Sequence, residues 1–163
     1  MLIFRVTKSL LKELKLQSTR VDIADPFFSW HANNFVLNRR KCIVFMNDLT
    51  RLSVTLYGIK AKEYKDLDGI FKVQLRDYLI SENIEEERID KYLERCGDEA
   101  IISDTNNRSV LGTLKEVMLI MNTIEKNEWA SNLERDQWNN TIIYKPIGYQ
   151  QPIDVFKNEI NKL

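Results

Sequence analysis

The sequence predicts a protein of the α+β class, in which a small antiparallel sheet is covered by several helices. Two observations lead to this class. From residue 30 to residue 58, short apolar runs are separated by polar turns, and the pattern takes the period of two that strands have. After Gly58, apolar side chains recur three and four positions apart, as they do along one face of a helix. Strands gathered in one part of a chain and helices in the other are typical of this class.

The N-terminal part is predicted to begin with one strand and one helix. Residues 2–6 (LIFRV) have the composition of a strand. Thr7 is suited to be the N-cap of the following helix, KSLLKELKL, because its hydroxyl can accept a hydrogen bond from the first turn. Leu10, Leu11 and Leu14 share one face of that helix. Residues 17–28 predict a loop.

Three further strands predict an antiparallel meander over residues 33–58, which the strand at 2–6 can join. Residues 41–46 (KCIVFM) are apolar on both faces, as a central strand would be. The next strand, RLSVTLY, alternates between apolar and polar side chains. Its polar face consists of Arg51, Ser53, Thr55 and Tyr57. The three predicted strands are 33–38, 41–46 and 51–57.

The second part of the chain is predicted to be mostly helical. Acidic residues at the start of SENIEEERIDKYLERCG and the glycine at its end are the start and stop signals of a helix. Pro152 is suited to the first position of a last helix. Residues 125–143 show no readable pattern. The predicted elements are helices at 60–81, 84–96 and 108–127, a strand at 99–104, and the helix that begins at Pro152.

The length of 163 residues fits one domain, with residues 1–58 mostly β and residues 59–163 mostly α apart from one short strand. The formal net charge is zero but is unevenly divided. Residues 1–60 carry ten Lys/Arg and four Asp/Glu, which makes +6, so the remainder carries −6. Either the basic part is a face for an anionic partner, or the two parts complement each other within the fold or in self-association.

The cysteines and the N-terminus indicate a cytoplasmic protein. Cys42 and Cys96 lie 54 positions apart, which is neither a disulfide framework nor a metal-binding pair, so both are expected to be buried thiols. The N-terminal segment is interrupted by charged residues. We therefore expect neither a signal peptide nor a membrane span, and no membrane partner.

Several kinds of chemistry lack their sequence signals. The five glycines are isolated, so none forms a phosphate-binding loop or a dinucleotide fingerprint. One histidine and two distant cysteines do not make an ordinary zinc site. No Gly-x-Ser-x-Gly nucleophile turn occurs. We therefore expect no metal and no cofactor, and an enzymatic function is the less favoured one.

Two polar turns lie at opposite ends of the predicted middle strand, so they are not expected to share one small site. Asn38, Asn47 and Asp48 are explained by turn chemistry, because Asn and Asp side chains bond to the backbone two residues on. Residues 39–41 (RRK) are either a solvated hairpin tip or an anion contact. Guanidinium groups can bind phosphate or carboxylate through two parallel hydrogen bonds.

His31 is the candidate catalytic residue, because an imidazole exchanges protons near neutral pH. Its alternative role is that of a hydrogen-bonded structural residue. Trp30 either stacks on a ligand ring or belongs to the core. In an extended segment, His31 and Asn33 face the same side. Arg51 and Tyr57 can line a groove with His31, which makes this the candidate pocket. The binding candidates together are Trp30, His31, Asn33, Asn38, Arg39, Arg40, Arg51 and Tyr57.

Seven segments carry a resemblance to a known family: TKSLLKEL (7–14), WHAN (30–33), NRRK (38–41), ND (47–48), YG (57–58), RSVLGTL (108–114) and GYQQPIDVF (148–156). Together they are similar to an uncharacterised bacterial protein family, a domain of unknown function marked by W-H-A-N, N-R-R-K and G-Y-x-x-P. The resemblance covers nearly the whole chain, which favours one domain. It implies no activity. It implies only that the candidates at 30–40 belong to the pattern that defines the family.

The leading hypothesis is a non-enzymatic binding or accessory protein whose basic N-terminal sheet receives an anionic ligand, a nucleic acid or an acidic protein surface. Phosphate binding would make its affinity fall steeply with salt. One alternative is a small enzyme with His31 as acid or base on a phosphate- or carboxylate-bearing substrate, which Asn33 or Arg51 would stabilise. Another is a homo-oligomeric structural protein, such as a homodimer formed through an edge strand or the Met-rich face at 118–121.

Overall fold

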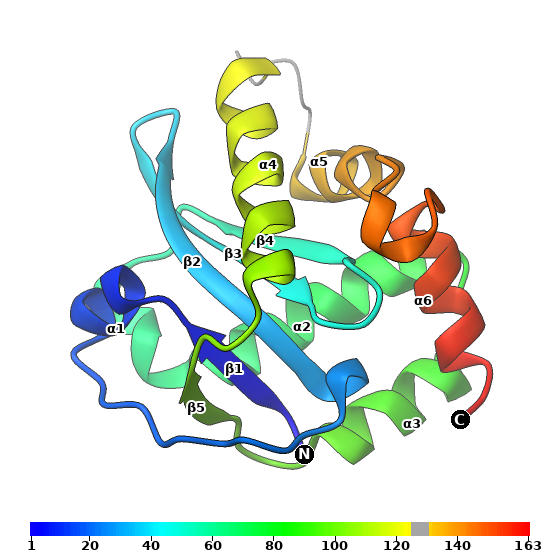
Figure 1. Cartoon of the computed structure of the whole chain (residues 1–163), viewed down its shortest axis with the longest axis horizontal. Coiled ribbons are helices and arrows are strands. Elements are labelled where there is room, and N and C mark those ends of the chain that lie inside the picture. The colour runs from blue at the N-terminus through cyan, green and yellow to red at the C-terminus, as the bar shows by residue number, and fades with distance from the viewer. Residues whose placement is uncertain (125–130) are drawn as a thin grey trace.

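The computed structural model describes residues 1–124 and 131–163. Its centre is an open, mixed sheet of five strands in the order β4-β3-β2-β1-β5 (Figure 1). Strands β2, β3 and β4 pair antiparallel, whereas β1 runs parallel to both of its neighbours, β2 and β5. The strands are β1 (Ile3–Val6), β2 (Ser29–Leu37), β3 (Arg40–Asn47), β4 (Ser53–Tyr57) and β5 (Ile101–Asp104).

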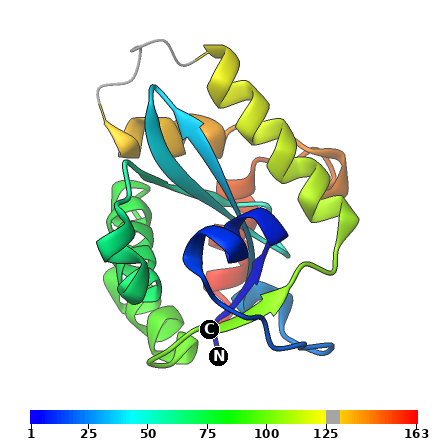
Figure 2. The same cartoon turned by 90° about the vertical axis from the view of Figure 1, so that its left-hand side faces the viewer.

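Helices cover both faces of the sheet, with α2 and α3 on one side and α4 on the other (Figure 2). The larger core lies on the first side, where Phe4, Trp30 and Phe71 are fully buried. On the second side, Val44 packs in a smaller core with Leu114 of α4. The described helices are α1 (Lys8–Leu14), α2 (Leu67–Ser81), α3 (Glu86–Cys96), α4 (Arg108–Ile124), α5 (Asn132–Asn139) and α6 (Pro152–Ile160), with short 3-10 helices at Pro26–Phe28, Ala61–Asp66 and Lys145–Ile147.

The α+β class and the antiparallel meander are confirmed, but the sheet is mixed rather than wholly antiparallel. The connection from β1 to β2 spans residues 7–28 and contains α1, and a connection of that length allows two strands to run parallel. β2 begins at Ser29, earlier than predicted, because its first residues pair with β1. The predicted helix over 60–81 is divided into a 3-10 helix and α2 at Asp66, whose backbone is not helical.

Local signals in the sequence account for several boundaries. The hydroxyl of Thr7 accepts a hydrogen bond from the backbone N–H of Leu10 at 3.4 Å, so the predicted N-cap is confirmed. Pro152 begins α6, as predicted. Asn38 and Arg39 connect β2 to β3 with φ angles of 50° and 62°, which is the backbone of a two-residue type I′ hairpin turn. Both cysteines are buried free thiols, as predicted.

The polar face of β4 is covered rather than open, which corrects the expected groove. Ser53 and Thr55 are buried, because α5 and the residue after it lie along the outer edge of β4. The side-chain amide of Asn140 accepts from the backbone N–H of Ser53 and donates to its carbonyl, both at 2.8 Å. Asp136 accepts from the N–H of Thr55 at 3.1 Å. These bonds replace the partner strand that an edge lacks.

The segment at 125–143, for which the sequence showed no pattern, contains α5. Residues 125–130 lie outside the described part of the chain, and so does the end of the predicted helix at 108–127. At the opposite edge of the sheet, the N–H of Thr19 donates to the carbonyl of Ile102 in β5 at 2.8 Å. The loop predicted at 17–28 therefore runs beside β5 before it reaches β2 (Figure 1).

Candidate functional site

A buried arginine lies in the middle of the sheet. Arg5 is in β1, between His31 of β2 and Ser103 of β5, which are its partners in register. Only 3% of the residue is exposed. Its Nη1 donates to the carbonyl of Val21 at 2.9 Å and to the Ser103 hydroxyl at 3.3 Å. Arginine is rarely buried without a charged partner, so the surroundings of Arg5 require a negative charge.

Asp48 supplies this charge and also orients His31. Its Oδ2 lies 3.8 Å from Nε of Arg5, and its Oδ1 lies 2.6 Å from Nδ1 of His31. The other ring nitrogen, Nε2, accepts from the backbone N–H of Asn106 at 3.4 Å. Because Nε2 faces a donor, the ring proton of a neutral imidazole belongs on Nδ1, where it is donated to Asp48. The imidazole is held from both sides.

Arg51 brings a second guanidinium to Asp48. Its Nη1 donates to the backbone carbonyl of Asp48, and its Nη2 donates to the hydroxyl of Ser109 in α4 at 3.2 Å. Burial lowers the pKa of Arg51 below its ordinary value, against the opposite effect of Asp48. The Nε atoms of Arg5 and Arg51 are buried without a hydrogen-bond partner. In this cluster, which we call the Arg5–His31–Asp48–Arg51 cluster, the carboxylate of Asp48 pairs with Arg5, and its backbone carbonyl accepts from Arg51.

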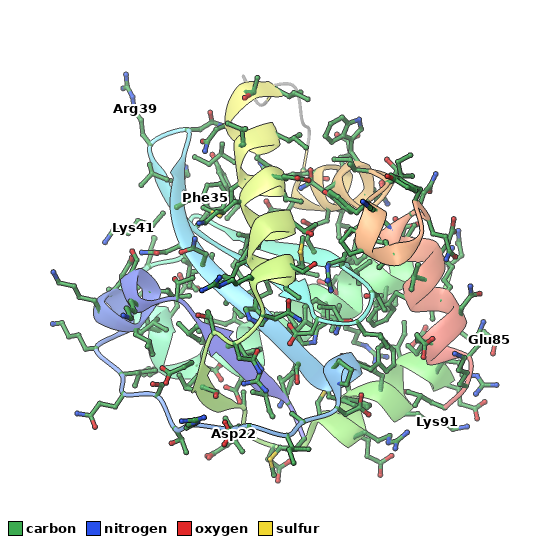
Figure 3. All side chains as sticks on the ribbon, viewed as in Figure 1. Asp22, Phe35, Arg39, Lys41, Glu85 and Lys91 are labelled. Atoms are coloured by element: carbon green, nitrogen blue, oxygen red, sulfur yellow. The ribbon has the colours of Figure 1, made fainter. Side chains whose placement is uncertain are left out.

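A surface pocket of about 270 Å³ opens beside Arg5. Two connections form its walls: the loop between α1 and β2, and the segment between β5 and α4, which passes in front of β1 (Figure 1). Asp22 lies on the first of these connections, at the lower edge of the sheet (Figure 3). We call this hollow the Arg5 pocket. Its lining residues are Arg5, Arg20, Val21, Asp22, Ser103, Asp104, Thr105 and Asn106.

Two of the predicted site residues are brought together, and a third is not. His31 and Arg51 both contact Asp48. Tyr57 lies at the far end of β4, where its ring is 6.0 Å from the guanidinium of Arg40 and 4.7 Å from that of Arg135. The three residues of the expected pocket therefore do not line one cavity.

The other two candidates near His31 have structural contacts. Trp30 is fully buried in the larger core, where its indole N–H donates to the hydroxyl of Tyr92 at 3.1 Å. The side-chain oxygen of Asn33 accepts from the hydroxyl of Thr7 at 2.8 Å. Both positions are explained by packing and by hydrogen bonds within the protein.

The hairpin tip is a convex surface. Arg39 extends away from the tip into solvent (Figure 3). Arg40 lies over the ring of Tyr57, and Lys41 pairs with Glu13 at 3.5 Å. Asn38 occupies the first position of the turn with positive φ, as its turn chemistry predicts. Because the cations diverge, the tip does not gather them around one ligand-sized space.

Arg5 and Asp48 of the cluster were not predicted, and neither were the other residues that line the pocket, such as Ser103 and Asn106. The signal for Arg5 is present in the sequence, since a charged residue inside LIFRV implies a buried charge or an edge position. Asp48 was attributed to turn chemistry, which its neighbour Asn47 performs instead by accepting from the N–H of Thr50 at 3.0 Å. The contacts of Ser103 and Asn106 depend on which strands are neighbours in the sheet, and the sequence alone does not show this.

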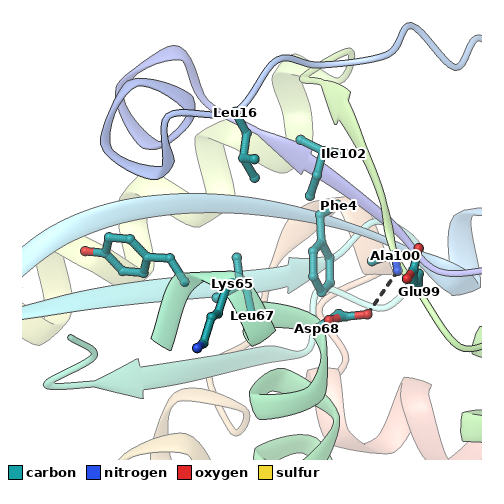
Figure 4. Close-up of a pocket in the computed structure, with 9 residues that line it drawn as sticks. Phe4, Leu16, Lys65, Leu67, Asp68, Glu99, Ala100 and Ile102 are labelled. Atoms are coloured by element: carbon teal, nitrogen blue, oxygen red, sulfur yellow. Dashed lines mark hydrogen bonds between the residues drawn. The ribbon is translucent and has the colours of Figure 1, made fainter. Parts of the chain in front are cut away.

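A second pocket, of about 280 Å³, lies between the loop after α1 and the start of α2 (Figure 4). Two of its polar side chains, Asp68 and Tyr64, are engaged within the fold. Asp68 accepts from the N–H of Ala100 at 3.2 Å and from that of Gly69 at 3.0 Å. The hydroxyl of Tyr64 donates to Glu13 at 2.5 Å.

Within residues 1–124 and 131–163, no group of three or more His, Cys, Asp or Glu side chains is arranged to hold a metal ion. In the same residues, no helix combines the length and the apolar character that crossing a bilayer requires.

Fold and site together define a small α+β protein with a buried arginine–histidine–aspartate cluster beside a surface pocket. The model of the family described as Domain of unknown function (DUF6933) matches residues 3–155, and the chain belongs to this family. The resemblance to an uncharacterised family is thus confirmed. No curated protein and no solved structure matches the chain.

Proposed function

We propose that this protein binds a small molecule through an anionic group, a carboxylate or a phosphate, in the Arg5 pocket. The observation that carries the proposal is the state of Arg5, which is buried beside the pocket with the carboxylate of Asp48 3.8 Å from an Nε that has no hydrogen-bond partner. A buried charge without a full counter-charge is costly, and an arriving anion would remove that cost. Arg5 is the member of the cluster that lines the pocket.

The surroundings favour a binding role of this kind. Residues 1–60 carry a net charge of +6, so the N-terminal part attracts anions from solution. Ser103 adds a hydroxyl next to the guanidinium of Arg5, and Thr105, two residues further along the chain, adds another. Planar guanidinium groups recognise carboxylate and phosphate through paired hydrogen bonds, which gives orientation as well as affinity.

The test is a titration with acetate, succinate and inorganic phosphate, followed by chemical-shift changes at constant ionic strength. Arg20→Gln removes a cation from the pocket. Because the Arg20 side chain is 82% exposed, we expect this variant to fold normally. Arg5→Lys keeps the buried charge but removes the planar fork. Arg39→Gln, at the hairpin tip, is the matched control. We expect wild type to bind at least one probe, with affinity reduced about threefold by Arg20→Gln and unchanged by Arg39→Gln.

Two results would contradict the proposal. If none of the probes binds to the wild-type protein, the Arg5 pocket is not an anion site. If Arg39→Gln abolishes binding while Arg5→Lys and Arg20→Gln leave it intact, the anion site is at the hairpin tip instead. Circular dichroism of each variant separates loss of binding from loss of fold.

A second candidate function is acid–base catalysis by His31, and one observation favours it. The 2.6 Å contact with Asp48 resembles the support that a general base receives from a carboxylate. Against it, His31 is fully buried, and its Nε2 faces the N–H of Asn106 rather than a cleft. Diethyl pyrocarbonate, which modifies accessible imidazoles, distinguishes the two. We expect modification of this single histidine only after unfolding, whereas rapid modification of the native protein would favour the enzyme.

The homodimer alternative depends on a free edge or an apolar helix face. Asn140 and Asp136 bond to the outer edge of β4, and Thr19 bonds to β5. On the helix face, Met121 is buried and Met118 accepts a contact from the amide of Asn33 at 3.6 Å. Because these contacts occupy the sheet edges and part of the helix face, they favour the binding function over the homodimer. Sedimentation equilibrium at high concentration tests the alternative, since a stable dimer would restore it.

A further inference from the structure

Exposed lysines gather on two short helices that lie side by side. On α1 and its C-cap, three of them are spaced four and three positions apart, so they form one stripe along the helix. On the 3-10 helix Ala61–Asp66, two more are three positions apart, a spacing that places both side chains on one line. Two further lysines lie next to these helices. We call this surface the lysine face, and its members are Lys8, Lys12, Lys15, Lys41, Lys60, Lys62 and Lys65.

Glu13 connects the elements that carry these lysines. Its carboxylate, in α1, accepts a hydrogen bond from the hydroxyl of Tyr64, in the 3-10 helix, at 2.5 Å. The same carboxylate lies 3.5 Å from Nζ of Lys41, at the start of β3. Figure 2 shows α1 facing the viewer, with the β2–β3 hairpin above it. Three segments that are far apart in the sequence thus form one surface.

Lysines from different elements are neighbours on this surface. Lys15 and Lys65 line one hollow of about 350 Å³ between α1 and the 3-10 helix. The N–H of Ile59 donates to the carbonyl of Lys41 at 3.0 Å, so the backbone of Lys60 follows beside that of Lys41. Like charges that the fold brings together repel one another, and an anion placed between them would remove the repulsion.

The lysine face contains fewer carboxylates than cations. Segments 8–15 and 60–66 together with Lys41 contain seven lysines and three carboxylates. Within residues 1–124 and 131–163, Lys41 is the one member of the face that has an ion-pair partner, Glu13. The other lysines are exposed and therefore attract an anionic partner from solution.

The composition of the face favours a nucleic acid over a protein or a membrane. Lysine is depleted in protein–protein interfaces, whose centres are apolar and aromatic. Attachment to a membrane surface requires apolar side chains that enter the headgroup region. In segments 8–16 and 60–66, Leu16 is the one exposed large apolar residue, and it is 45% exposed. Separate lysine charges spread over a surface suit a chain of phosphates, which are contacted one by one.

We infer that the lysine face binds the phosphate backbone of a nucleic acid. Phosphate contacts position a protein on the strand but carry no information about its sequence, so the binding is independent of sequence. The lysine face shares no residue with the Arg5 pocket. The inference therefore adds a second binding surface and does not depend on the proposed function.

The test measures fluorescence anisotropy of labelled DNA of mixed sequence, as a single strand and as a duplex, between about 50 and 200 mM KCl. Lys12→Gln/Lys15→Gln removes two charges from α1, and Lys62→Gln/Lys65→Gln removes two from the 3-10 helix. All four side chains are exposed, so we expect both variants to fold normally.

The matched control, Lys91→Gln/Lys162→Gln, changes the net charge of the protein by the same amount. Lys91 lies across the molecule from Lys41 (Figure 3). Poly-glutamate and vesicles of anionic lipid are the comparison probes, because they carry negative charge without a nucleic-acid backbone.

We expect wild type to bind at least one form of DNA, with an affinity that falls as salt rises. Each face variant should bind about tenfold more weakly at low salt, and its logarithmic salt slope should be smaller by about 2, since each phosphate contact contributes about 1. The control should retain the affinity of wild type.

Three results would overturn the inference. The first is that wild type binds neither form of DNA at the lowest salt concentration. The second is that the control weakens binding as much as the face variants do, since net charge would then explain the effect. The third is tighter binding to poly-glutamate or to the vesicles than to DNA, which would assign the face to an acidic protein or to a membrane.

Discussion

Oδ1 of Asp48 and Nδ1 of His31 lie 2.6 Å apart, although the two residues are separated by 17 positions and by the whole length of the β2–β3 hairpin. The contact forms because the turn after β3 returns the chain to the start of β2, where the N–H of Asp48 donates to the carbonyl of Ser29 at 2.9 Å. The carboxylate of Asp48 is thereby placed between His31 and Arg5, and its backbone carbonyl faces Arg51.

Asp48→Asn should destabilise the protein strongly. Asn keeps the shape, can still accept from His31 and keeps the backbone bond to Arg51, but it leaves the buried Arg5 without its paired negative charge. Removing one partner of a buried ion pair costs about 3–5 kcal/mol. Urea unfolding at pH 7 measures the change, with the exposed Asp77→Asn as a control that should stay within about 0.5 kcal/mol of wild type. A change below about 1 kcal/mol for Asp48→Asn would show that Arg5 does not depend on this carboxylate.

Asp136→Asn should change how stability depends on pH. Burial raises the pKa of Asp136 well above its ordinary value of 3.8, despite the hydrogen bond from the N–H of Thr55. The native state therefore retains a proton that the unfolded chain loses. This group favours folding most below pH 4, and its contribution declines as the pH rises from there towards its native pKa, by about 1.4 kcal/mol per unit.

The amide introduced by Asp136→Asn would keep the bond to Thr55 and would not ionise. Unfolding free energies of the two proteins at pH 4, 5, 6 and 7 give the comparison. We expect the unfolding free energy of the variant to rise relative to that of wild type at each increase in pH. Parallel pH profiles would mean that Asp136 is not held protonated in the native state.

Tyr64→Phe should weaken the protein most at neutral pH. The hydroxyl of Tyr64 donates to Glu13, a bond that is the largest cause lowering the pKa of the carboxyl. Burial and the same bond raise the pKa of Tyr64 to about 12. A hydrogen bond to a charged group contributes about 1.5–3 kcal/mol, and partial exposure of Glu13 places the expected loss near the lower end.

Because the folded pKa of Glu13 is depressed, this stabilisation is present above pH 4.5 and is lost as the pH falls through the folded value. The difference between Tyr64→Phe and wild type should therefore be largest at pH 7 and shrink in acid. Denaturant unfolding at pH 7 and pH 3 measures it, and a difference that is the same at both pH values would exclude the role of Glu13.

Arg39→Gly should stabilise the hairpin without affecting ligand binding. Arg39 has a φ of 62°, a left-handed conformation that costs a non-glycine residue about 1 kcal/mol. Asn-Gly is the preferred pair for a type I′ turn. We expect the melting temperature to rise by several degrees, as about 1 kcal/mol produces in a domain of this size. If the substitution removes anion binding instead, the conformation of Arg39 is retained for function.

Sequence patterns predicted most elements because their causes are local. The hydroxyl of Thr7, the ring of Pro152 and the glycine at the end of α3 each act within one turn of helix. The antiparallel meander could be predicted because the two turns that connect its strands are short. The polar face of β4 was misread as a groove, since the segment that covers it lies more than 80 positions away along the chain.

By itself, the sequence determined the class of the fold, the order of its elements and the presence of a basic N-terminal part that carries the single histidine. Periodicity and caps carry this information because they involve residues within a few positions of one another. The tertiary structure alone decided that Arg5 lies between His31 and Ser103, and that one carboxylate contacts both Arg5 and His31. These contacts arise from parallel pairing of strands far apart in the chain, and the Arg5 pocket exists only where the strands' connections meet.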